Sequence, residues 1–137
     1  MFRHTLARPI DANSTIAVGQ AVTIDTGALE PLDGPTNQAG TAAVKPAGIA
    51  LTSAVDGTEC TVCFSGECNA LLGATVAVGD ELVAEFETGR LIPYVIAAYV
   101  DGTEIQIICR ALEAGIDGQQ ARVNVNIYGK TVPTAPV

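Results

Sequence analysis

Three of the four cysteines of this chain lie within nine residues, in the segment CTVCFSGEC. Cys60 and Cys63 form a Cys-x-x-Cys pair, and Cys68 follows shortly after. Thiolates at such spacing can ligate Zn²⁺, and two neighbouring thiols can close a disulfide. The segment therefore raises three alternatives: a metal site, a disulfide, or free thiols that act as small apolar side chains.

A strand over this segment argues against the metal site. Thr61 and Val62, which separate the first two cysteines, favour strands and not the turn of a zinc knuckle. Residues three apart on a strand point to opposite faces, so their thiolates do not converge on one ion. The single histidine, His4, is far away in the sequence. We expect no metal site, with Cys60 in the core and Cys63 facing outward.

A disulfide between Cys63 and Cys68 stays open as an alternative. The intervening Phe64-Ser65-Gly66-Glu67 could form a four-residue turn that places the two cysteines opposite one another. Thiols stay reduced in the cytoplasm, however, unless something oxidises them later. We therefore expect free thiols.

Catalytic groups are scarce in this sequence. A nucleophile needs a positioned base, and the one histidine lies near the N-terminus. Glu85 and Glu87 flank Phe86 as on a solvated strand face, and Asp80 follows a turn glycine. No phosphate-binding Gly-x-x-x-x-Gly-Lys loop occurs. We expect no enzymatic activity, no catalytic residues and no cofactor.

The chain repeats itself with a nearly constant offset. The stretch IAVGQAVTIDTGALEP (residues 16–31) resembles VAVGDELVAEFETGRLIP (residues 76–93). The matched residues, at offsets between 60 and 62, are Gly19 and Gly79, Gly27 and Gly89, Pro31 and Pro93, Ala50 and Ala111, and Asp56-Gly57 and Asp117-Gly118. The common order and spacing of these landmarks indicate a tandem duplication.

Composition and periodicity predict an all-β fold. The chain has 14 Gly and 7 Pro, which suits many short strands joined by turns. From Ala121 to Tyr128 apolar and polar residues alternate, as on a half-buried strand. Each copy holds too few strands to close a core alone. We therefore expect a small β-barrel or sandwich built from two tandem, pseudo-symmetric β repeats.

The expected organisation is one β domain between two extended arms. The N-terminal arm covers residues 1–15, and the domain covers residues 16–129. Repeat one spans about residues 16–68 and repeat two about residues 76–129. Residues 130–137 contain two prolines and form an extended C-terminal tail.

Charge limits the partners of this chain. Seven Lys and Arg against fifteen Asp and Glu give a formal net charge of -8, which repels nucleic acid and anionic lipid. No stretch reaches the roughly 18 apolar residues of a membrane-spanning helix, and the first residues lack the apolar run of a signal peptide. We expect a soluble protein made in the cytoplasm, with no nucleic-acid or membrane partner.

The chain resembles the head decoration, or capsid cement, proteins of bacteriophages. The resemblance rests on V-x-V-G-D-x-L (residues 76–82), G-R-L-I-P (residues 89–93) and C-R-A-L-E-A (residues 109–114). In the first half it rests on A-G-I-A-L (residues 47–51) and D-G-T-E-C-T-V-C-F-S-G (residues 56–66). It implies an all-β fold, no enzymatic activity, and a homo-oligomer, with a trimer favoured over a dimer, on the outside of an icosahedral shell.

The resemblance implies a virion protein, made in the host cytoplasm, that binds the capsid exterior and cements neighbouring major capsid subunits. Phe2, Arg3 and Arg8, in a locally basic segment of an acidic chain, are the candidate capsid-docking residues. The alternative is a small β-barrel binding module, such as an adhesive or glycan-recognising knob. That module would need an exposed pocket, for which Tyr94 and the other two tyrosines, Tyr99 and Tyr128, are the available aromatic groups.

Overall fold

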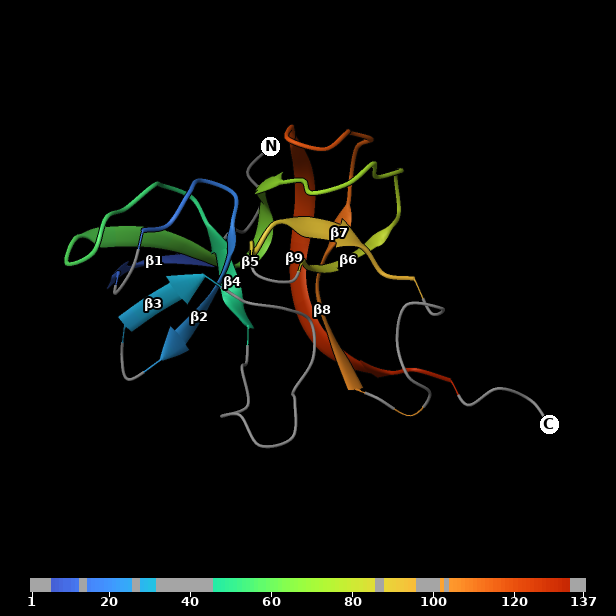
Figure 1. Cartoon of the computed structure of the whole chain (residues 1–137), viewed down its shortest axis with the longest axis horizontal. Helices are drawn as coiled ribbons and strands as arrows, with labels where there is room; N and C mark the ends of the chain where they lie inside the picture. Colours follow the sequence, from blue (N-terminus) through green and yellow to red (C-terminus); the bar gives the residue numbers. More distant parts are fainter. Residues whose placement is uncertain are drawn as a thin grey trace.

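The protein is all-β, as the sequence predicts. The structure is a computed structural model and describes residues 6–12, 15–25, 28–31, 46–85, 88–95, 102 and 104–133. Its elements are β1 (Leu6–Asp11), β2 (Ala21–Asp25), β3 (Ala28–Pro31), β4 (Pro46–Ala50), β5 (Glu59–Leu71), β6 (Glu81–Ala84), β7 (Leu91–Pro93), β8 (Glu104–Ala111) and β9 (Gln120–Thr131) (Figure 1). None of these described residues belongs to a helix that could span a membrane.

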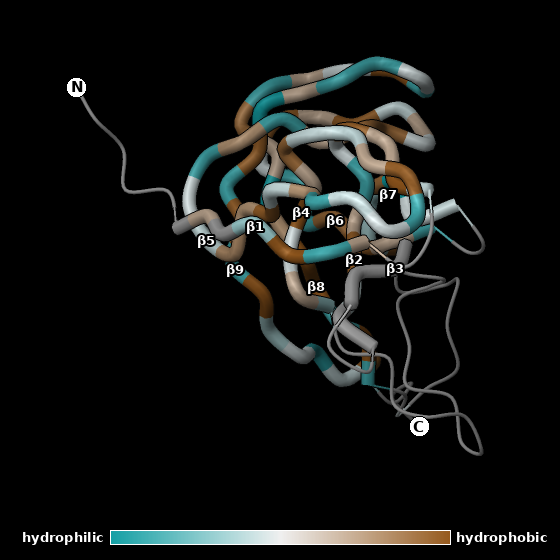
Figure 2. The backbone as a smooth tube through the Cα atoms, turned by 90° about the vertical axis from the view of Figure 1, so that its left-hand side faces the viewer, coloured by the Kyte–Doolittle hydropathy of each residue, from teal (hydrophilic) through white to brown (hydrophobic). Residues whose placement is uncertain are grey.

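Alternating side chains explain why these segments form strands. In β9 the side chains of Ala121, Val123 and Val125 are buried, whereas those of Arg122 and Asn124 are exposed. Successive residues of a strand point to opposite faces, so this sequence buries one face and hydrates the other. Figure 2 shows the same feature as short hydrophobic and hydrophilic stretches that follow each other closely along the tube.

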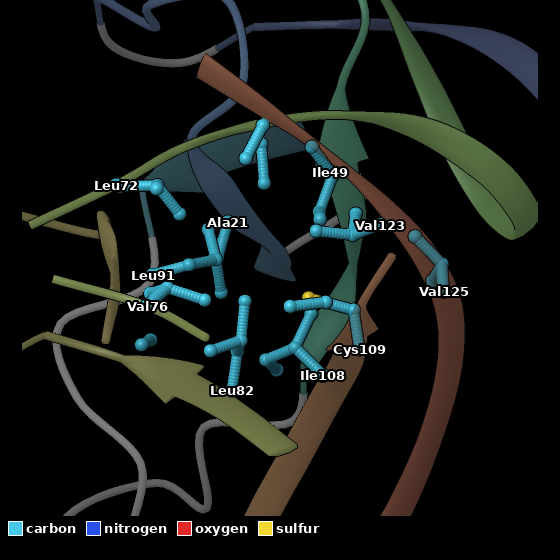
Figure 3. Packing of buried hydrophobic residues seen from close by; sticks show 14 of the residues in the cluster. Ala21, Ile49, Leu72, Val76, Leu82, Leu91, Ile108, Cys109, Val123 and Val125 are labelled. Atoms are coloured by element: carbon cyan, nitrogen blue, oxygen red, sulfur yellow. The ribbon is translucent and has the colours of Figure 1, made fainter. Parts of the chain in front are cut away.

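The strands form one antiparallel sheet in the order β3-β2-β4-β5-β9-β8-β6-β7, and β1 pairs with β5 beside this path. The sheet curls into a nearly closed barrel. An isolated bridge joins Leu72, just after β5, to Leu91 of β7. Across the largest core cluster, Ala21 of β2 lies near Leu91, and Ile49 of β4 lies near Val123 of β9 (Figure 3).

The two copies of the repeat have the same strand register. In repeat one, β2 pairs with β3 through Val22 and Pro31, and in repeat two β6 pairs with β7 through Leu82 and Pro93. These pairs stand 60 and 62 residues apart, the offsets read from the sequence. The duplication is therefore present in the backbone pairing itself.

The turns repeat as well. The amide of Gly19 donates to the carbonyl of Ala50 at 2.8 Å, and that of Gly79 donates to the carbonyl of Ala111 at 2.8 Å. Both glycines have a positive φ, 85° and 89°, a backbone conformation that glycine adopts without strain. The matching glycines of the two copies are therefore fixed by the same turn geometry.

Strand β5 belongs to both repeats. Its first part pairs with β1, where Asp11 faces Glu59, and its second part pairs with β9, where Leu71 faces Gln120. Gly66, at the middle of the strand, has φ 97° and marks the junction. By register the first repeat runs through residues 6–65, and the second begins at residue 66, earlier than the sequence analysis placed it.

The arms differ from the sequence expectation. Leu6–Asp11, assigned to an N-terminal arm over residues 1–15, form β1 and complete the first repeat. Pro9 is compatible with a strand that pairs along one edge. At the other end β9 continues to Thr131, and Val132 is fully buried. Residues 1–5 and 134–137 lie outside the described part of the chain.

Candidate functional site

The cysteine segment is a continuous part of strand β5. Cys60 and Val62 are fully buried on the inner side of the first repeat, as predicted. Cys63 points to the opposite face but is also fully buried, so the prediction that it faces outward is wrong. The reason is that the second repeat covers this face, and Cys63 belongs to the cluster shared by both repeats.

Cys63 and Cys68 lie on one continuous strand with no turn between them, and the Cys63 thiol donates to the carbonyl oxygen of Ser65 at 3.4 Å. The hydrogen bond from Cys68 lowers the pKa of Cys63, against the opposing effect of burial. The same hydrogen bond, together with burial, raises the pKa of Cys68. Burial raises the pKa of Cys60 and, with the nearby charge of Cys63, that of Cys109. All four cysteines are free thiols in this structure.

Asp80 and Glu85, two of the acidic residues considered for catalysis, hydrogen-bond within turns. Asp80 accepts a hydrogen bond from the amide of Ala77 at 2.9 Å, and Glu85 accepts one from the hydroxyl of Thr88 at 2.7 Å. No group of three or more His, Cys, Asp or Glu side chains that could hold a metal ion occurs among residues with described positions. A shallow hollow of about 350 Å³ near Val55 is lined by hydroxyl and aliphatic groups.

The residues predicted to dock on a capsid are only partly placed. Phe2 and Arg3 lie outside the described residues. Arg8 lies in β1, where its backbone pairs with Val62 of β5. A role for these three residues in docking therefore stays a prediction.

The contact between the repeats identifies a surface that the sequence analysis missed. In repeat one, Ala21, Ile49 and Cys63 are paired in register on neighbouring strands and are fully buried against repeat two. Leu51 and Val18, which lie in turns, also contact repeat two. Leu51 packs against the same cluster, and the carbonyl of Val18 accepts a hydrogen bond from Gln120. These five residues of repeat one form a docking face that repeat two occupies.

Repeat two carries a copy of this docking face that the described residues of repeat one do not cover. We call it the exposed face, and its residues, placed by the same register, are Val78, Glu81, Arg110, Leu112 and Asn124. Val78 is 67% exposed and Leu112 is 38% exposed, whereas their counterparts in repeat one are partly covered. Two large aliphatic side chains thus lie in solvent where the first repeat uses the same positions for binding.

Ile116 and Val55 show that exposure alone does not define this face. They are counterparts in the two repeats, next to equivalent turns, and they are exposed to similar extents, 55% and 59%. Because the repeat contact covers neither, they mark the tips of turns and not the docking face.

A polar cluster occupies one side of the exposed face. Lys130 of β9 donates to Glu81 of β6 at 2.7 Å, and the hydroxyl of Tyr128 also donates to the Glu81 carboxylate. The Lys130 ammonium lies 5.1 Å from the centroid of the Tyr94 ring, within the range of a cation–π contact. The cluster links β6, β9 and the residue that follows β7.

The pKa values in this cluster follow from its hydrogen bonds. The bond from Lys130, and secondly that from Tyr128, lowers the pKa of Glu81. The bond to Glu81 raises the pKa of Lys130. Tyr94 and Tyr128 are half-buried within this arrangement, and Tyr99 lies outside the described residues. The cluster is therefore a fixed, ionised support for the exposed face.

The exposed face carries two exposed aliphatic side chains, Val78 and Leu112, beside the ion pair of Glu81 and Lys130. Those features suit the binding of another protein, for which exposed apolar residues rimmed by polar groups are typical. A signal for this face was present in the sequence, because aligning the repeats places Ala21, Ile49 and Cys63 on Glu81, Arg110 and Asn124. It became readable only when the structure identified which face of repeat one is buried.

Comparison with known proteins identifies the fold. No protein-family model and no curated protein matches this chain. Among solved structures, it is similar to the N base of head fiber gp8.5 of bacteriophage phi29, with a TM-score of 0.60 and 16% sequence identity. The match covers 90% of this chain and 95% of that chain. The chain therefore has, over nearly its whole length, the fold of the base of a phage head fiber.

Proposed function

We propose that this protein is a structural component of a phage virion that binds the outer surface of the capsid and cements neighbouring major capsid subunits. The observation that carries the proposal is the fold, shared with a phage head fiber protein over almost all of both chains. The sequence resemblance to capsid decoration proteins points the same way. The proposal includes a homotrimer and no catalytic activity.

The exposed face of repeat two is the proposed capsid-docking surface. The equivalent face of repeat one is covered by the β-strands of repeat two, so residues at these positions can contact another β-structured surface. The counterpart positions in repeat two keep two aliphatic side chains, Val78 and Leu112, and replace the buried centre by charged and amide groups. A half-apolar, half-charged surface suits a partner that assembles with an already folded protein.

The first test is co-sedimentation of the purified protein with shells of the major capsid protein from the same phage. We expect saturable binding at a fixed copy number per capsomer, and its loss in the double variant Val78→Ser, Leu112→Ser. The matched control is Val55→Ser, Ile116→Ser, which changes two similarly exposed residues outside the face and should leave binding unchanged. Equal binding by both variants would remove the exposed face from the proposal.

The role of Phe2 and Arg3 needs a separate variant. Deletion of residues 1–5 leaves β1 intact, whereas a longer deletion removes a strand of the sheet. We expect the short deletion to weaken shell binding while the thermal unfolding curve stays the same. Undiminished occupancy would show that the segment takes no part in docking. Saturable glycan binding without shell binding would instead favour the alternative, a glycan-recognising module.

A further inference from the structure

Strand β9 extends beyond the strand that pairs with it on one side. Its first half, residues 120–125, pairs with β5, whereas β8 pairs with both halves, as far as Thr131 opposite Glu104. Among the residues that the structure describes, no strand pairs with the β5 side of residues 126–131. Figure 1 shows this half of β9 continuing towards the C-terminus. We call this side of residues 126–131 the open edge.

Three backbone hydrogen bonds show which way β9 directs its amides and carbonyls. The carbonyl of Gln119 accepts from an amide on the β5 side at 2.8 Å, whereas the carbonyls of Arg122 and Val132 accept from amides on the β8 side at 2.9 Å. Backbone groups of successive residues alternate between the two edges of a strand. Odd-numbered residues of β9 therefore direct their backbone groups away from β8.

The side chains of β9 show that this alternation is not interrupted. Ile127 packs against the same cluster as Val123 and Val125, whereas Tyr128 and Val132 pack in a different cluster. The irregular register between β8 and β9 therefore leaves β9 itself regular.

The open edge presents the backbone N–H and C=O groups of Ile127, Gly129 and Thr131. Gly129 and Thr131 are exposed, and Ile127 is half-buried. The strand contains no proline that would remove one of these donors, and the first proline after it is Pro133. An unpaired row of backbone donors and acceptors is a template for an added strand.

The equivalent edge in repeat one is occupied. At the offset of 61 that relates Cys60 to Ala121, residues 66–70 of β5 correspond to residues 127–131 of β9. Residues 66–70 pair with β9, a strand of repeat two, and repeat two also covers the docking face of repeat one. In repeat one a single partner therefore both covers the face and pairs with the edge.

The exposed face and the open edge of repeat two adjoin each other. Asn124 of the exposed face lies just before the open edge on the same strand. Lys130, within the open edge, donates to Glu81 of the exposed face at 2.7 Å. A partner that covers the exposed face is therefore placed to pair with the open edge, as repeat two does in repeat one.

We propose that the capsid subunit that covers the exposed face also adds an extended segment, as an antiparallel strand, to the open edge of β9. This inference rests on the proposed function, which makes the major capsid protein the partner. The segment bonds through its main chain to the outward backbone groups of Ile127, Gly129 and Thr131. Main-chain bonds supply the affinity, and the side chains of the exposed face supply the specificity.

Hydrogen exchange of single amides, measured with and without saturating shells of the major capsid protein, tests the added strand. The amides of Ile127, Gly129 and Thr131 should exchange at least about tenfold more slowly on the shells than in the free protein. The amides of Tyr128 and Lys130 point to β8 and should be slow in both states, so they are the reference. Protection in the free protein that rises with its concentration would assign the open edge to a second copy and overturn the proposal.

Thr131→Pro removes one outward N–H group and should weaken shell binding about tenfold, because an acceptor of the partner stays unpaired. Thr131→Val keeps this N–H and should bind as the wild type does. Strand β1 shows that the fold accepts such a proline. The amide of Ala12 donates to the carbonyl of Thr58 beside β5 at 2.8 Å, so Pro9, three residues earlier, points outward. Both variants should therefore keep the thermal unfolding curve of the wild type.

The outcomes separate this inference from the proposed function. Shell binding by the wild type without slower exchange at the three outward amides would overturn the added strand and leave the proposed function standing. Equal shell binding by Thr131→Pro and Thr131→Val would do the same. Absence of shell binding by the wild type would contradict both.

Discussion

Gly48 of β4 lies against the backbone of β5. A Cβ atom at this position would stand 2.0 Å from the carbonyl oxygen of Cys63, which cannot move without breaking the pairing of the two strands. We therefore expect Gly48→Ala to lower the free energy of unfolding by about 3 kcal/mol or more. Urea denaturation followed by circular dichroism measures this change.

Gly79→Ala is the matched control for Gly48. This glycine has a positive φ, but no atom lies within 4 Å of the place that a Cβ would take, so only backbone strain opposes the substitution. That strain is worth about 1–2 kcal/mol. An effect at Gly79 as large as that at Gly48 would contradict the close approach of β4 and β5.

Glu81 ties pH to stability. Its pKa is lowered in the folded state by Lys130 and Tyr128, so its contribution is present above the unfolded carboxyl pKa and is lost as pH falls through the folded value. The pKa of Lys130 is raised, so the contribution of this partner is lost only as pH rises through that raised value. The pair should therefore stabilise the fold from about pH 4.5 to above pH 10.

Glu81→Gln should lower the free energy of unfolding by about 1 kcal/mol at pH 7, because the side chain of Lys130 is 38% exposed and solvent screens the pair. The difference between the wild type and the variant should be smaller at pH 2.5, because the pH falls towards the lowered pKa of Glu81. The control is Asp117→Asn, whose ion pair with Arg90 at 3.5 Å is far more exposed and should contribute little at either pH. An effect of Glu81→Gln that persists undiminished at pH 2.5 would contradict the assignment.

Single residues show where sequence reasoning ended. Alternation along a strand correctly assigned Cys60 to the core and Cys63 to the opposite face. It could not reveal that the opposite face is also buried, because that depends on how the second repeat packs. The four-residue turn that would have placed Cys63 opposite Cys68 does not form, because β5 continues through both residues and Gly66 between them has φ 97°.

At the level of the elements, the two repeats use one strand pattern for two different environments. Ile49 of β4 and Arg110 of β8 occupy equivalent register positions, yet Ile49 is fully buried and Arg110 is exposed. In repeat one this face is apolar and is buried against repeat two, whereas in repeat two the same positions carry polar or exposed side chains. Burying the charged groups of this face would cost free energy unless a partner compensated them.

A reciprocal exchange tests this interpretation. Ile49→Arg buries an uncompensated charge between the repeats and should cost at least about 3–5 kcal/mol, enough to unfold much of the protein. Arg110→Ile changes an exposed side chain and should stay within about 1 kcal/mol of the wild type in urea denaturation. Comparable losses in both variants would contradict the assignment of one face as buried and the other as exposed.

Strand β1 shows the limit of prediction at this scale. The all-β class, the repeat and its offsets followed from periodicity and spacing alone. The basic residues near the N-terminus suggested an arm, because strand pairing at the sheet edge leaves little trace in a single sequence. The duplication indicates this strand, because the two repeats contain equivalent pairs. Asp11 pairs with Glu59 in repeat one, and Leu71 pairs with Gln120 in repeat two.

For the whole molecule, the sequence predicted a barrel or a sandwich without deciding between them. The decision depends on pairings between distant segments, such as the bridge from Leu72 to Leu91, and on how far the sheet curls. The formal net charge of -8 leads us to expect that the surface repels nucleic acid, a prediction that binding measurements can test. A curled double-repeat sheet with one occupied and one exposed copy of the same face is the framework for the proposed capsid contact.

The most direct test of the central claim is cryo-electron microscopy of shells of the major capsid protein saturated with this protein. The account predicts added density at a fixed set of symmetry-related positions on the outer surface, in contact with neighbouring capsid subunits through Val78 and Leu112. Absence of added density at saturation, or density confined to the inside of the shell, would contradict it.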